Sequence, residues 1–290
     1  MIRTHVRNST PSPGVTFSEQ LALGTAKLAS ETAHISPSVE HSVQVIFTSY
    51  GDLVSVHDKG KFLYKFGRNR AINTSYQTLQ PEGGDETYAT DNVIDKISSS
   101  NSADTQKVII EGHTIDSQGN LTFVVQEATL AGQTETAIPT PLARCTRAYN
   151  NSATTFAGDI YIYEDDTVSA GVPQTAANIH LKVVSGDQSE KASTSISYQD
   201  YFILTEVKVY CFDKSSEIIE MDLEIRRVGV TNQTFRRIFS TSAADGQPTN
   251  IIFEPPLIIP KNHDVRMRAK SAGASADVGG ALNGYLAKVV

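Results

Sequence analysis

Short runs of β-branched and aromatic residues, separated by turn residues, recur along almost the whole chain from residue 43 onward. Clear examples are VQVIFTS (43–49), QKVIIEG (106–112), IHLKVVS (179–185) and YFILTEVKVYCF (201–212). Such runs at intervals of roughly 8–15 residues, without interleaved helical patterns, are typical of sandwiches and barrels. The pattern predicts an all-β protein, an antiparallel β-sandwich that resembles a jelly roll and contains one or two β subdomains.

The sequence predicts three regions along the chain. Residues 1–42 form a polar arm that includes a short helix within FSEQLALGTAKLASETAH (17–34), where Phe17, Leu21 and Leu28 have roughly helical spacing. Residues 43–166 form an N-terminal β domain, and residues 167–290 form a C-terminal, jelly-roll-like sandwich. The division falls at DDTVSAGVP, which is polar and contains Gly and Pro. A single, intimately packed unit is the alternative.

Composition excludes several classes of function. The 290 residues carry a net charge of −7, which argues against a protein that binds the phosphates of nucleic acid. No apolar run approaches the roughly 18–20 residues that cross a membrane. The N-terminal residues lack the apolar segment of a signal peptide, so Cys145 and Cys211 are expected to be reduced and buried. The chain has no Trp, which counts against a surface that grips sugars.

The stretch GDIYIYEDD (158–166) is the part of the chain that most resembles a chemical site. On a strand, Glu164 and Asp166 would point the same way, roughly 7 Å apart. That separation falls in the range for an inverting glycosidase, but any acid pair at a strand end produces it. Glu164, Asp165 and Asp166 are therefore interpreted as a solvated strand end, with a subunit contact and a cation site as alternatives.

Two arginine pairs lie symmetrically about the presumed turn VGVTNQ. In a hairpin centred there, Arg226 would lie opposite Arg237, and Arg227 would lie opposite Arg236. Like charges at facing positions are destabilising unless an anion neutralises them. We expect this tip to contact carboxylates of a neighbouring subunit, with a screened, exposed hairpin or a shifted register as the alternatives.

Motifs for catalysis, metals and cofactors are absent from the sequence. The seven histidines are scattered and have no zinc-ligand spacing, and neither a nucleophile elbow nor a phosphate-binding glycine loop occurs. The sequence therefore predicts a protein that is not an enzyme and that uses no cofactor or metal.

Several strands and turns resemble those of structural proteins of tailed bacteriophages, particularly marine ones. The resemblance covers residues 60–290 and rests on Ile110-Glu111-Gly112, the Asp116–Asn120 turn, the Leu121–Glu127 strand, the Leu130–Thr134 turn and the Arg144–Tyr149 strand. It implies a β-sandwich building block that is present in many copies in a virion assembled in the host cytoplasm. The matching residues are structural and imply no chemical site.

Three functions are compatible with these observations. The first is a capsid decoration or cement protein, a homotrimer that bridges the major capsid protein or other virion proteins and binds neither nucleic acid nor membrane. The second is a tail, collar or fibre component that contacts host glycans. The third is a polysaccharide hydrolase or lyase, which would need Glu164 or Asp166 to meet another acid, Tyr161 or Tyr163 in a cleft.

Overall fold

The structure is a computed structural model that describes residues 45–47, 53–55, 61–184, 188–212, 218–231, 233–244, 248–273 and 275–288. Almost all of the described elements are antiparallel strands, and these residues contain no α-helix. The prediction of an all-β sandwich fold is therefore confirmed. The predicted arm and its helix lie outside the described residues. The first described elements after them are the short strands β1 (Val45–Phe47) and β2 (Leu53–Ser55).

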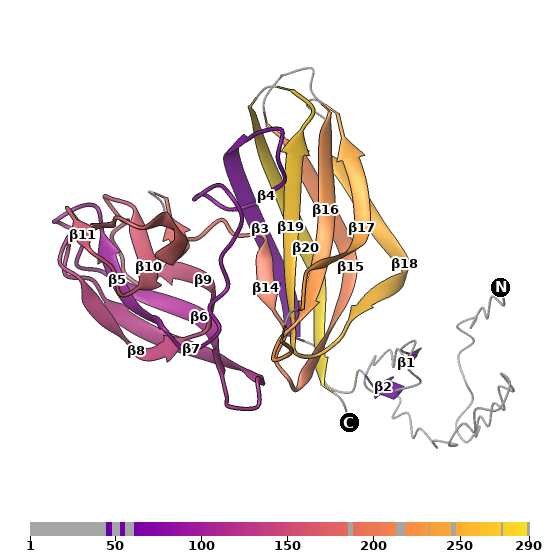
Figure 1. Cartoon of the computed structure of the whole chain (residues 1–290), viewed down its shortest axis with the longest axis horizontal. Helices are drawn as coiled ribbons and strands as arrows, with labels where there is room; N and C mark the ends of the chain where they lie inside the picture. The colour runs from indigo at the N-terminus through magenta and orange to yellow at the C-terminus, as the bar shows by residue number, and fades with distance from the viewer. Residues whose placement is uncertain are drawn as a thin grey trace, which may run out of the picture. The chain divides into compact units, whose positions relative to one another are not determined.

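Two sheets form one sandwich (Figure 1). The first has the order β18 (Thr249–Ile259), β15 (Asp200–Cys211), β20 (Ala276–Lys288) and β3 (Lys61–Ile72). The second has the order β14 (Ser193–Ser195), β19 (His263–Ser271), β16 (Ile219–Arg227) and β17 (Arg236–Ala243), and β4 (Gln77–Thr78) also pairs with β19. With β4 and β14 taken as one strand, this is the eight-strand order of a jelly roll.

The strand made of β4 and β14 is interrupted by a large insertion. Both pieces pair antiparallel with β19, and the gap between them is closed where Ala192 N donates to Leu79 O at 3.0 Å. Gly67 lies against this closure, where a Cβ atom would come within 2.2 Å of two backbone atoms. Only glycine allows β3 to approach so closely. Residues 80–191 thus form an insertion in the middle of one jelly-roll strand.

The insertion is a second sandwich with its own core. One sheet contains β13 (Ile179–Val183), β10 (Ile160–Glu164), β5 (Ile94–Ser99) and β8 (Thr136–Leu142). The other contains β7 (Leu121–Thr129), β6 (Lys107–Ile115) and β9 (Arg144–Asn150). A ribbon of β11 (Val168–Ser169) and β12 (Val172–Pro173) and the 3₁₀ turn η1 (Ala176–Asn178) connect β10 with β13.

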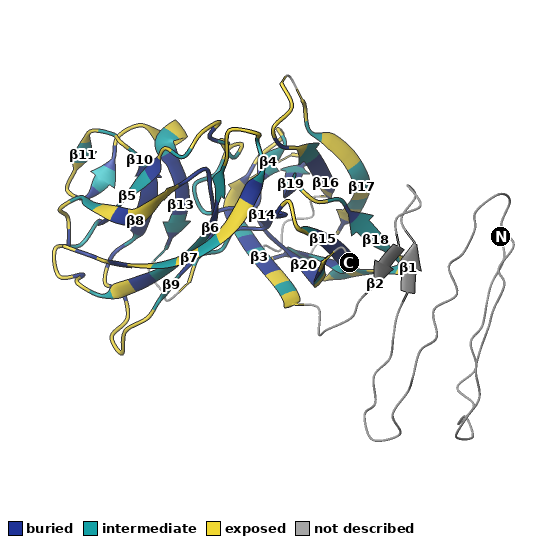
Figure 2. Cartoon of the chain, turned by 90° about the horizontal axis from the view of Figure 1, so that it is seen from below, coloured by how far each residue is buried: buried dark blue, intermediate teal, exposed yellow. Residues whose placement is uncertain are grey.

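Each sandwich buries an apolar cluster between its two sheets (Figure 2). The jelly-roll core includes Phe202, Leu204, Val207 and Val209 of β15. These residues point to one face because side chains alternate along a strand, with one shift at the bulge between Leu204 and Glu206. The apolar residues that recur along the strand patterns of the sequence therefore lie in these two cores.

Strand pairing crosses residue 166, where the sequence predicts a division of the chain. β10 pairs with β13 on the far side of that position, while β3 and β4 pair with strands near the C-terminus. The segment DDTVSAGVP forms the β11–β12 ribbon of the inserted sandwich. A linear division of the sequence cannot represent a domain inserted within a strand.

Candidate functional site

A buried ion pair joins the inserted sandwich to the jelly roll. Arg144 of β9 donates from Nε to Oδ1 of Asp264 on β19 at 2.9 Å, and from a terminal nitrogen to Oδ2 at 3.1 Å. The hydroxyl of Ser195 on β14 donates to the same carboxylate at 2.7 Å. Arg144 and Asp264 are buried, and the two facing groups form the fork geometry that favours an arginine–carboxylate pair.

Arg226 makes a second contact with the same carboxylate. Its terminal nitrogen donates to Oδ2 of Asp264 at 2.7 Å, and its guanidinium lies 4.5 Å from the ring centre of Tyr88. Burial alone would raise the pKa of Asp264, but Arg144 and Arg226 hold that pKa below its ordinary value. The carboxylate is therefore ionised and fully engaged by its partners.

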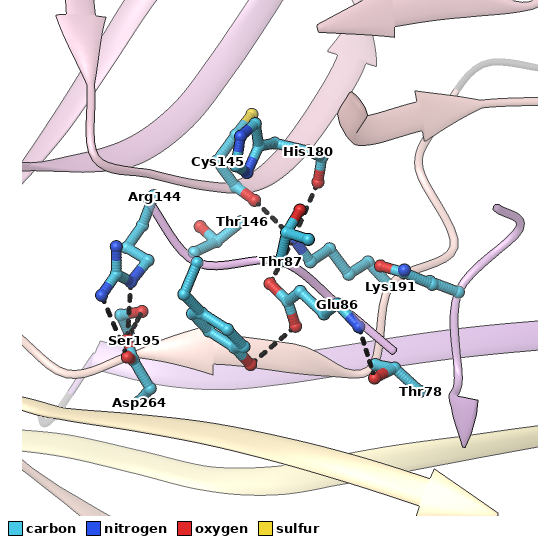
Figure 3. Close-up of polar contacts among 12 residues, drawn as sticks. Thr78, Glu86, Thr87, Arg144, Cys145, Thr146, His180, Lys191, Ser195 and Asp264 are labelled. Carbon is cyan, nitrogen blue, oxygen red and sulfur yellow. Dashed lines mark hydrogen bonds and ion pairs between the residues drawn. The ribbon is translucent and has the colours of Figure 1, made fainter. Parts of the chain in front are cut away.

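A neighbouring ion pair extends the junction (Figure 3). Lys191 Nζ lies 2.6 Å from Oε1 of Glu86 and also donates to the backbone carbonyls of Cys145 and His180. Oε2 of Glu86 accepts a hydrogen bond from the Tyr88 hydroxyl, and the backbone N–H of Glu86 donates to Thr78 Oγ1. Each charged group in this cluster has an opposite charge within reach, so the cluster holds segments together.

The junction lacks an activated nucleophile. Burial raises the pKa of the Cys145 thiol to about 12, so the sulfur is protonated near neutral pH. Lys191 is bound by Glu86 and two carbonyls, and Asp264 by two arginines.

A cleft opens next to this junction, with a volume of about 800 Å³. One wall is the Lys61–Phe66 end of β3, and another is formed by residues of β6 and β7 that include His113 and Phe123. Lys65, His113 and Lys191 are buried titratable groups of its lining, and Lys65 and His113 are only 5% and 3% exposed. The cleft has room for a ligand.

The acidic stretch forms no convergent site. Glu164 pairs with His180 of β13, with Oε1 and Nε2 2.7 Å apart, whereas Asp166 accepts the backbone N–H groups of Thr167 and Thr175 in the following loop. Asp165 is exposed. None of these acids lines the cleft, nor do Tyr161 and Tyr163.

The predicted pairing of arginine with arginine is wrong. A bulge between Leu223 and Glu224 shifts the register, so that Arg237 faces Glu224 and Arg236 faces Ile225. Arg226 instead faces Asp264, and Arg227 faces His263, on the other neighbouring strand. The shifted register, one of the alternatives considered above, removes the repulsion and gives Arg226 and Arg237 carboxylate partners within the chain.

Side chains that hold metals do not gather among the described residues, where no group of three or more His, Cys, Asp or Glu could ligate an ion. Burial lowers the pKa of His180 below its ordinary value, although the hydrogen bond to Glu164 opposes this effect. Within the described segments, none of the helical structure is long and apolar enough to cross a membrane.

The sequence interpretation missed the junction and the cleft. Arg144 and Asp264 are separated by 120 positions, so no local pattern connects them. One signal was present: Asp222, Glu224 and Arg226 face Arg268, Arg266 and Asp264 in register, so the charges of IIEMDLEIRR and DVRMR are complementary when the strands run antiparallel.

Comparisons with known proteins give weak results. No protein-family profile matches the chain, and no curated protein matches it. VP2 of infectious bursal disease virus, from its subviral particle, is similar over 79% of this chain and 73% of its own, with 9% identity and a TM-score of 0.20. A structure of the Gt strain of the same virus covers 79% and 72%, with 10% identity and a TM-score of 0.18. Such low TM-scores do not establish a shared fold.

Proposed function

We propose that this chain is a non-enzymatic structural protein of a tailed-phage virion, a homotrimeric decoration protein that bridges capsid subunits. The jelly roll is a fold of viral capsid domains and also of unrelated binding proteins, so it supports the proposal only as an analogy. The resemblance of strands and turns to phage structural proteins supports it further. The carrying observation is an exposed aromatic surface on the jelly roll.

This aromatic surface lies on part of the outer face of the β18-β15-β20-β3 sheet. Phe62 and Tyr64 of β3 are 58% and 49% exposed, and Tyr285 of β20 and Ile252 of β18 are 44% and 65% exposed. The Phe62 and Tyr285 rings meet edge to face with centres 5.7 Å apart. Clustered apolar side chains on a surface mark a contact with another macromolecule.

Buried charge at the junction supports a structural role. The Arg144–Asp264 pair fixes the inserted sandwich to the jelly roll, and the Lys191–Glu86 pair lies beside it within the inserted residues. An assembly that bears load requires such rigid connections between its parts. The same pairing leaves these groups without the free proton or free nucleophile that catalysis would require.

Immunogold labelling of purified virions tests the proposed location. Antibody raised against the recombinant protein should label the head densely. Label on the tail or its fibres would favour the second function, and the absence of label from intact and opened particles would contradict both.

Variants of the aromatic surface test how the protein attaches. The double variant Tyr285→Asp/Ile252→Asp should remain folded, because both side chains are exposed, and should lose co-sedimentation with capsids. Val93→Asp, at an exposed residue of the inserted part, is the matched control. Equal co-sedimentation of the double variant and the control would contradict attachment through this face.

A tail, collar or fibre component that contacts host glycans is the second candidate. The same exposed aromatic side chains favour it, because flat rings stack against sugar rings. A glycan array probed with the protein distinguishes this function, since a decoration protein should bind no glycan on it.

A further inference from the structure

The cleft beside β3 exposes the edge of a strand. Among the described strands, β3 ends the β18-β15-β20-β3 sheet and pairs with β20 alone. The cleft is lined by six consecutive residues, Lys61–Phe66. Since successive side chains point to opposite faces of a sheet, a continuous run along one wall shows that the strand edge itself opens into the cleft.

The hydrogen-bonding groups on this edge have a definite direction. The backbone N–H of Arg68 donates to Glu190 O at 3.4 Å, so it points away from β20. In an antiparallel strand every second residue points the same way, which directs the N–H and C=O groups of Phe62, Tyr64 and Phe66 into the cleft. Within the described residues, no hydrogen bond is formed by these backbone groups. An unpaired edge is a template for another strand.

The cleft also contains a buried cation that forms no ion pair among the described residues. Lys65 Nζ donates to the backbone carbonyl of Thr146 at 3.0 Å. Burial lowers the pKa of Lys65 to about 8; the Glu111 carboxylate opposes this shift, and Arg147 and Lys191 add to it. Nδ1 of His113 is buried and has no hydrogen-bond partner. These groups leave a place for an anionic oxygen.

The rim of the cleft repeats this positive charge. Lys61 Nζ lies 4.5 Å from the ring centre of Phe123, and Arg147 and Lys288 also line the cleft. The acids of the lining are Glu111 and Asp200. Lys61 and Lys65 lie on the same face of β3 with Leu63 between them, so a facing strand would meet a cation, an apolar side chain and a cation.

We propose that the cleft binds an extended, acidic peptide segment that adds to β3 as a strand and places carboxylates opposite Lys61 and Lys65. Backbone hydrogen bonds to Phe62, Tyr64 and Phe66 would supply affinity, and the side chains would supply specificity. Facing side chains in neighbouring strands lie about 5 Å apart, within reach of a charge pair. The ligand carries an acid, an apolar residue and an acid at positions i, i+2 and i+4. This proposal goes beyond the virion role and does not depend on it.

Lysines on an edge strand have a second known use, because inward-pointing charges prevent unwanted strand pairing. The two roles give opposite results. If the lysines of β3 serve to prevent strand pairing, they repel any added strand, and replacing them promotes self-association. If they form a ligand site, they accept an acidic strand, and replacing them weakens its binding.

The full-length protein is titrated with the peptide Ac-TETVTET-NH2, and amide hydrogen exchange is followed along β3. Binding should slow exchange at Phe62, Tyr64 and Phe66. Lys65→Met should weaken binding by about tenfold or more, as expected for loss of a charge-assisted contact. Lys61→Met, at an exposed residue, should weaken it less. Lys107→Met, in the inserted sandwich, should leave it unchanged.

Three results would overturn the proposal. One is the absence of protection of β3 by the acidic peptide, and another is equal protection by the uncharged peptide Ac-TQTVTQT-NH2. The third is self-association of Lys65→Met in place of weakened peptide binding, which would show that Lys65 serves to prevent strand pairing.

Discussion

At the scale of single residues, two of the buried titratable groups of the cleft, Lys65 and His113, reduce stability. Lys65 is charged at neutral pH and forms no ion pair among the described residues, and His113 is held neutral without a partner for Nδ1. Neither property could be predicted from KFLYKFG or IIEGH, where both residues resemble ordinary members of a strand. Burying an unsatisfied polar group costs free energy, and proteins tend to retain such groups where a functional site needs them.

Replacing Lys65 with Met should stabilise the protein. The folded state has a Lys65 pKa of about 8, below the ordinary 10.5, so the unfolded chain binds more protons between these values. Wild-type stability should therefore rise with pH from 8 to 10.5, by up to about 3 kcal/mol. Lys65→Met should lack this rise and gain about 1–2 kcal/mol at pH 7, after losing the hydrogen bond to Thr146. Urea unfolding at pH 7 and pH 10 measures both effects. A Lys65→Met variant less stable than the wild type at pH 7 would contradict this prediction.

His113 should make the protein sensitive to acid. Burial, followed by the charge of Lys65, lowers its pKa to about 3 from the ordinary 6.5. The unfolded chain binds the proton first as pH falls, so stability is lost from pH 6.5 downward, by up to about 5 kcal/mol at pH 3. His113→Phe should flatten this dependence in urea titrations at pH 4 and pH 7. An unchanged slope would show that other groups cause the acid sensitivity.

At the scale of elements, alternation in a sequence indicates burial on one face of a strand only. Met221, Leu223 and Ile225 of β16 alternate with charged residues and are buried. The charged face also buries Asp222 and Glu224, because Arg237 and Arg266 pair with them from the flanking strands. A single sequence shows which residues share a face, but the register that pairs their charges depends on the bulge and on distant strands.

The ion pair between β9 and β19 should be essential to stability. Asp264→Asn would leave Arg144 buried without its counter-charge, a loss of about 3–5 kcal/mol. Because the pKa of Asp264 is depressed by its arginines, the stabilising effect is present above pH 3.8 and is lost as pH falls through the folded value. Chemical denaturation compares Asp264→Asn with Asp85→Asn, which alters an exposed acid. Equal losses in the two variants would show that the junction adds nothing.

At the scale of the whole molecule, the all-β class could be predicted from the spacing of strands, but the insertion could not. β4 contains only two residues and β14 only three, and they become one strand only when residues 80–191 fold between them. The same limit applies to the candidate site. The Lys65 side chain lies under a carbonyl of β9, 81 positions away in the chain.

The arginine tip still offers a candidate subunit contact, in a corrected form. Arg226 and Arg237 have partners within the chain, whereas Arg227 and Arg236 are exposed and form no ion pair among the described residues. If the proposed homotrimer forms through this tip, Arg227→Glu/Arg236→Glu should leave the fold intact and reduce its formation at least tenfold, as measured by sedimentation velocity at low salt. Arg70→Glu, at another exposed position, serves as the control. Unaltered association of the double variant would exclude the tip from the subunit contact.

The proposed membership of a virion is tested most directly by quantitative mass spectrometry of gradient-purified phage particles whose genome encodes this sequence. The proposal predicts that the protein is abundant, at a fixed molar ratio to the major capsid protein that persists through successive gradients. Its absence from purified particles, with the protein present only in the lysate of infected cells, would contradict a structural role in the virion.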